Sequence, residues 1–115
     1  MYSIEKCHLA KADDTTKALF RQFIDSIASF GPIQLEPLKS IIAIKKRSQF
    51  CSISVQKHAL KVAFRMISNL TEPPNPRFNQ TSHQLNWYYY EIYIRSPVDL
   101  DDECINWLRT AYEEN

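Results

Sequence analysis

The chain has 115 residues, of which 44% are hydrophobic and 23% are charged, and its formal net charge is +1. This size fits one folded domain with a single core, and this composition excludes intrinsic disorder. The sequence contains no apolar run of the roughly 20 residues that are needed to cross a bilayer. The near-neutral total hides an asymmetry that favours an anionic partner, because residues 37–90 contain eight Lys and Arg but one acid, whereas residues 91–115 carry a net charge of −5.

The first predicted helix covers residues 13–30 and follows an N-terminal extension, residues 1–12. Asp13, Asp14 and Thr15 are suitable N-caps, and Gly31 followed by Pro32 is a typical stop signal. The apolar residues of this segment recur every three or four positions, as on one buried helical face. They are Leu19, Phe20, Phe23, Ile24, Ile27 and Phe30.

After this helix the apolar period changes to two, which predicts strands with one buried face. Short connections between these strands favour antiparallel pairing. Residues 68–84 contain three prolines with several Asn, Ser and Thr, and they predict a long loop. The predicted strands lie within residues 33–35, 42–44, 51–55, 60–66 and, rich in aromatic residues, 85–95.

A closing helix is predicted after Pro97, with Asp99 as its cap and an acidic first turn. Its buried stripe would contain Cys104, Ile105, Leu108, Ala111 and Tyr112. Together the elements predict a single α+β domain over residues 1–115. We expect a two-layer sandwich, in which the N-terminal and C-terminal helices pack on one face of a mainly antiparallel sheet of about five strands.

Two segments of the sequence carry a resemblance to a known family. They are Phe30-Gly31-Pro32-Ile33-Gln34-Leu35-Glu36-Pro37-Leu38-Lys39, followed by Ile42-Ala43-Ile44-Lys45 and Phe50, and the closing Trp107-Leu108-Arg109 with Ala111-Tyr112. They resemble a small bacterial domain family of unknown function, whose members occur alone, behind a short helical domain, or at the end of larger proteins labelled predicted transport or restriction-associated. The resemblance covers residues 17–113 and departs from the family pattern around residues 71–84. It implies the fold and a bacterial, cytosolic setting, and it brings no activity. A weaker resemblance, at the level of the fold, is to YjbR-type domains, which have been described as DNA-binding-like.

The sequence gives little support to an enzyme. Gly31 is the single glycine, so the glycine-rich loops that hold phosphates or dinucleotides are absent. Glu36 and Lys39 flank a strand break, as an acid and a lysine do in metal-dependent nucleases, but no second metal-binding carboxylate accompanies them. His58 and His83 have no second ligand nearby in the sequence. We therefore expect no catalytic residue, metal site or cofactor, and the odd, scattered cysteines favour a reducing, cytoplasmic setting.

Alternation along the strands predicts a basic and aromatic face on the side of the sheet away from the helices. Cations beside flat rings are typical of surfaces that bind single-stranded nucleic acid. The leading hypothesis is therefore a non-catalytic module that binds nucleic acid or another polyanion. The residues assigned to phosphates are Lys39, Lys45, Lys46, Arg47, Lys61 and Arg65, and those assigned to base stacking are Trp87, Tyr89 and Tyr93.

Several alternatives remain open for the same face. The loop predicted over residues 68–84 would cover it as a second small core, or the face would join two copies of the chain or dock a partner protein. A small anionic ligand is a further alternative. An enzyme ranks last, and a pocket joining Glu36, Lys39 and a histidine would revive it.

Overall fold

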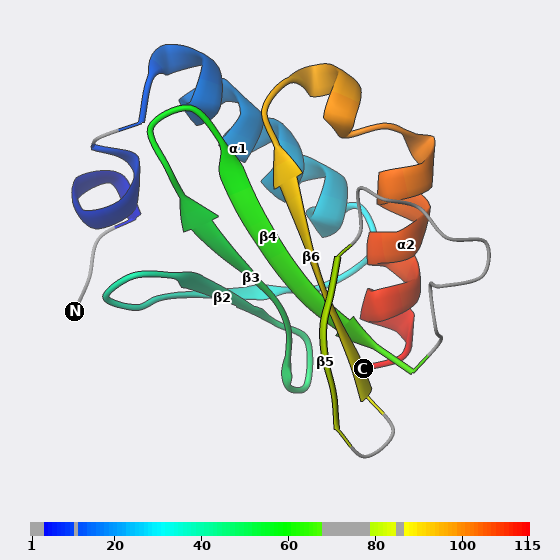
Figure 1. Ribbon diagram of the computed structural model, residues 1–115. Coiled ribbons are helices and arrows are strands. Elements are labelled where there is room, and N and C mark those ends of the chain that lie inside the picture. Colours follow the sequence, from blue (N-terminus) through cyan, green and yellow to red (C-terminus); the bar gives the residue numbers. More distant parts are fainter. Residues whose placement is uncertain (1–3, 11, 68–78, 85–86) are drawn as a thin grey trace.

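The computed structural model describes residues 4–10, 12–67, 79–84 and 87–115 (Figure 1). Within these residues, two α-helices pack on a six-stranded antiparallel sheet, which confirms the predicted two-layer α+β sandwich with one strand more than expected. In chain order the elements are the π-helix η1 (Ile4–Leu9), α1 (Asp14–Ala28), β1 (Gln34–Pro37), β2 (Ile42–Lys45), β3 (Gln49–Val55), β4 (Leu60–Met66), β5 (Asn79–Gln84), β6 (Trp87–Ile94), the 3-10 helix η2 (Pro97–Asp99) and α2 (Asp102–Glu113).

The strands lie in the order β1-β2-β3-β4-β6-β5, and every neighbouring pair is antiparallel. The predicted loop is wrong at its end, because Asn79–Gln84 forms the edge strand β5 and pairs with β6. This pairing uses backbone groups, so a polar segment can form it without the apolar alternation that marks the other strands. Residues 68–78 of the predicted loop lie outside the described part of the chain.

Both helices begin at an aspartate cap, but one of the two differs from the prediction. Asp13 caps α1 as expected and accepts a hydrogen bond from the backbone N–H of Thr16 at 2.8 Å. For α2 the predicted cap was wrong, because Asp101 accepts from the N–H of Cys104 at 3.0 Å. Pro97 starts a separate 3-10 turn, which places Asp99 before the helix, where its carboxylate accepts from two backbone N–H groups of the preceding residues.

The core lies between the helices and one face of the sheet, and α1 passes behind β4 and β6 in Figure 1. The central strands supply it by strict alternation, since Val62 is opposite Ile92 and Leu60 is opposite Ile94. Burial of such side chains contributes about 1.5–3 kcal/mol each. The helices add Leu19, Phe20, Phe23 and Ile27 from α1, and Cys104, Leu108, Ala111 and Tyr112 from α2.

The two segments that carry the family resemblance meet at the C-terminal end of α2. The Tyr112 hydroxyl donates to the carbonyl of Pro32 at 3.1 Å, and its ring lies 5.9 Å from that of Phe30. Gly31 has φ +148°, and a Cβ atom there would lie 2.5 Å from the Tyr112 hydroxyl. Only glycine tolerates this combination of backbone angle and close approach. These contacts therefore join the connection between α1 and β1 to the C-terminal end of α2.

Candidate functional site

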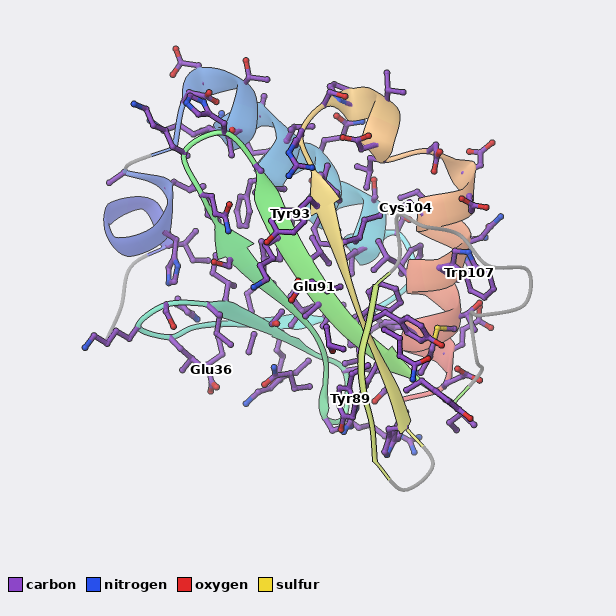
Figure 2. All side chains as sticks on the ribbon, viewed as in Figure 1. Glu36, Tyr89, Glu91, Tyr93, Cys104 and Trp107 are labelled. Atoms are coloured by element: carbon purple, nitrogen blue, oxygen red, sulfur yellow. The ribbon has the colours of Figure 1, made fainter. Side chains whose placement is uncertain are left out.

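Within the described residues, the face of the sheet away from α1 and α2 carries partly exposed side chains, as the alternation predicts, and we call it the open face. Val62 and Ile92 are buried in the core, whereas their neighbours Lys61 and Tyr93 point to the opposite side. Figure 2 shows Tyr89, Glu91 and Tyr93 following one another along β6, with Glu36 on the edge strand β1. The predicted alternation of buried and exposed side chains along β4 and β6 is therefore confirmed.

Small side chains form the floor of the open face. One cross-strand row runs from Glu36 through Ala43, Ser52 and Ala63 to Glu91, so three small residues lie between two acids. Ser52 and Ala63 are partly exposed and leave the surface hollow, because neither has a long side chain, whereas Ala43 is fully buried. Two neighbouring hollows of about 230 Å³ and 80 Å³ share Ser52 and Ala63 among their lining residues. We call these two hollows over β3 and β4 together the trough.

Each acid at the border of the trough is paired with a lysine. Lys45 Nζ lies 3.1 Å from the Glu36 carboxylate on the β1–β2 side, and Lys61 Nζ lies 3.3 Å from that of Glu91 on the β6 side. The Glu91 side chain is 22% exposed, so this carboxylate is the more enclosed of the two. The pairs offset the charges of the acids, and two of the predicted phosphate-binding lysines are therefore shared with carboxylates.

Cations also stack on the aromatic side chains of β6. The Arg65 guanidinium carbon lies 4.3 Å from the centre of the Trp87 ring, and that of Arg95 lies 4.8 Å from the Tyr93 ring. Arg65 is held further by hydrogen bonds to the side chains of Asn115 at 2.9 Å and Ser48 at 2.8 Å. Fixed in this way, the guanidinium and the indole present one composite surface, in which a flat cation is stacked on a flat neutral ring.

The other predicted phosphate ligands are spread over the connections. Lys39 is exposed between β1 and β2, and Arg47 is exposed in the turn between β2 and β3. Lys46 turns away from the trough, because its Nζ donates to the carbonyl of Tyr112 at 3.1 Å and lies 4.4 Å from the centre of that ring. Lys46 thus binds the C-terminal end of α2, where a cation is favourable.

A third hollow of about 600 Å³ adjoins the trough at the end of β3. It neighbours the trough, because both are lined by Ser40 and Ser54. His8 of η1 also lines it, is 3% exposed, and lies with Nε2 2.7 Å from the carbonyl of Leu38. Sequence reasoning missed His8, since its partner is 30 residues away in the chain. The remaining lining residues are Lys39, Val55, Gln56 and Lys57.

The enzyme alternative gains little from this arrangement. Lys39 and a histidine do line one hollow, but Glu36 is bonded to Lys45 and does not line it. Within the described residues, no three His, Cys, Asp or Glu side chains are grouped so that they could hold a metal ion. Burial raises the pKa of the Cys51 thiol, which leaves it in the poorly nucleophilic protonated form.

The other histidine with a described side chain has a structural partner. His58 Nδ1 lies 2.6 Å from Asp13 Oδ2, and the His58 side chain is otherwise exposed. The backbone N–H of Thr16, followed by the His58 ring, lowers the pKa of the Asp13 carboxyl from 3.8 to about 2. This pair joins the start of α1 to the β3–β4 turn. The side chain of His83 lies outside the described part of the structure.

No helix in the described part of the chain has the length and apolar character required to span a membrane. Comparison with the curated proteins and with the solved structures found no match. The family model described as Domain of unknown function (DUF5655) matches residues 5–115, and the chain therefore belongs to this family.

Proposed function

We propose that the open face binds single-stranded nucleic acid, with the strand lying along the trough. The observation that carries this proposal is a hollow floor of small side chains beside a row of aromatic rings, Trp87, Tyr89 and Tyr93, on one strand. Tyr93 is 37% exposed. Stacking of a base on such a ring contributes about 1–3 kcal/mol. The floor gives the strand room, and the rings give its bases a surface.

The cations around the trough support contacts with phosphates. Lys61 and Arg65 lie on the same side as the aromatic rings, and Lys45 lies across the floor from them. Lys39 and Arg47 lie beyond the trough, since Lys39 lines the adjoining hollow and Arg47 is exposed in the turn between β2 and β3. Lys46 is left out of the proposed site because it binds α2.

The two carboxylates favour a single strand over a duplex. Glu36 and Glu91 repel phosphates that come close to them, so a ligand must direct its phosphates toward the cations and away from the acids. A flexible single strand can do this and can turn its bases to the rings, whereas a duplex keeps its bases stacked inside. We therefore expect binding to depend on unpaired bases as well as on charge.

Titration of a fluorescent single strand and of the corresponding duplex, each at low and at physiological salt, tests the proposal. We expect the single strand to bind more tightly. If Lys45, Lys61 and Arg65 contact three phosphates, a plot of log Kobs against log salt has a slope of about −2. Equal affinity for the two ligands would contradict the stacking role, and an affinity independent of salt would contradict the role of the cations.

Self-association through the same face is the competing outcome. Interfaces between proteins are depleted of Lys and Glu at their centres, whereas the Lys61–Glu91 pair borders the middle of this face. Sedimentation velocity on the protein alone separates the two possibilities. A stable dimer in which the Trp87 fluorescence becomes shielded would overturn the nucleic-acid proposal, and a monomer that binds single strands would support it.

A further inference from the structure

The hollow at the end of β3 has the chemistry of an anion site. Its lining includes two lysines, Lys39 and Lys57, together with Ser40, Ser54 and Gln56. None of the described residues that line it is acidic, in contrast to the trough, which Glu91 borders. Ammonium and hydroxyl groups are donors to phosphate oxygens, so this end of the open face should attract the highest negative charge.

His8 gives this hollow a fixed wall. The Leu38 carbonyl can only accept a hydrogen bond, so Nε2 of His8, 2.7 Å away, carries the proton. The bond joins η1 to the connection between β1 and β2, which also carries Lys39 and Ser40. Because the ring is almost fully buried, it holds this connection in place and leaves little freedom to the two donors that follow Leu38. His8 is therefore a positioning residue of the hollow.

The position of the hollow relative to the trough indicates which phosphate it would receive. The hollow and the trough share Ser40 and Ser54 among their lining residues, so they are neighbours on this face. η1 contacts β3 and lies beside its C-terminal end in Figure 1. A nucleic-acid strand that follows the trough toward the C-terminal end of β3 therefore meets η1. The end of that strand would lie near Lys39 and Lys57.

We infer that this hollow binds the terminal phosphate of the nucleic-acid strand that occupies the trough, an inference that rests on the proposed function. A terminal phosphate carries close to two negative charges, whereas each phosphate inside a strand carries one. Two lysines and two hydroxyls match the larger charge and its three free oxygens. The ligand class is thus a single strand with a phosphate at one end, and η1 sets the length of strand that the face can hold.

Competition binding tests this inference. Oligonucleotides of one sequence that end in a 5′-phosphate, a 3′-phosphate or hydroxyls at both ends compete with a labelled single strand. We expect one of the phosphorylated strands to bind about tenfold more tightly than the strand with hydroxyl ends. Lys39→Gln and Lys57→Gln, made singly, should reduce this preference to about twofold or less while the hydroxyl strand still binds. The matched control is Arg21→Gln, which removes one exposed cation from α1 and should leave the preference unchanged.

The outcomes separate this inference from the proposal on which it rests. Salt-dependent binding with no preference for a terminal phosphate would overturn the phosphate site and leave the trough intact. A second measurement, calorimetry with thymidine 5′-monophosphate and 3′-monophosphate against thymidine, covers the case in which no longer strand binds. Binding of a monophosphate alone, lost in Lys39→Gln, would support the phosphate site while the trough proposal fails. Equal behaviour of the monophosphates and thymidine would then overturn the site as well. His8→Gln should weaken the preference for phosphate without affecting the hydroxyl strand.

Discussion

Replacing Glu91 by glutamine should tighten the binding of single strands to the trough. The Glu91 carboxylate lies 3.3 Å from Lys61 Nζ. A phosphate oxygen about 2.8 Å from the same ammonium would lie at most about 6 Å from the carboxylate. Two unit charges at about 6 Å repel by about 0.7 kcal/mol at the dielectric constant of water and by about 2.8 kcal/mol at an effective constant of 20. Since the site is open to solvent and salt screens it, we expect about three- to tenfold tighter binding.

The same titration, made at low and at physiological salt, measures this effect. Glu113→Gln is the matched control, because it removes the same charge from an exposed position on α2, in the layer opposite the trough. We expect its affinity to stay within about twofold of the wild type, since long-range effects of an exposed charge are screened. An equal gain in both variants would mean that net charge alone attracts the strand. Unchanged or weaker binding by Glu91→Gln would refute the assignment of Lys61 to a phosphate.

Three further changes test the row of Trp87, Tyr89 and Tyr93, which we call the aromatic wall, the contact of Gly31 with Tyr112, and the start of α1. Trp87→Ala should weaken single-strand binding by about 1–3 kcal/mol and leave duplex binding nearly unchanged, as measured by anisotropy. Gly31→Ala should lower the free energy of unfolding by about 1–3 kcal/mol in urea, because alanine is strained at φ +148°; an unchanged midpoint would contradict this. The depressed Asp13 pKa means that its stabilising effect is present above pH 3.8 and is lost as the pH falls toward 2, so acid unfolding should be less steep in Asp13→Asn.

The geometry of the open face could be predicted because β4 and β6 alternate strictly. Val62 and Ile92 are apolar while Lys61 and Tyr93 are not, and a period of two assigns such residues to opposite faces. The ion pairs could not be predicted in the same way. Lys61 meets Glu91 because β4 and β6 adopt a particular register, and a sequence without a known register does not say which residues of two strands are neighbours.

Other features were missed for reasons that the residues make clear. β5 has no apolar alternation, because an edge strand can be held by backbone pairing alone. His8 acquires its role through the Leu38 carbonyl, which belongs to a connection far along the chain. The serines of the trough did carry a signal. Ser52 and Ser54 alternate with buried residues of β3, so their place on the open face follows from the same rule that placed Lys61.

The folded structure also changes what the basic composition of the chain implies. Counted from the sequence, the seven Lys and Arg of residues 37–65 would give single-strand binding a salt slope of about −5 if each met a phosphate. In the structure Lys46 is bonded to α2, and Lys39, Arg47 and Lys57 lie beyond the trough. The cations beside the trough itself are Lys45, Lys61 and Arg65, for which the expected slope is about −2. A strand long enough to pass over the trough but without a terminal phosphate should therefore show the smaller value. A slope near −5 would mean that the ligand follows the charged edges of the molecule and that the aromatic wall is not its site.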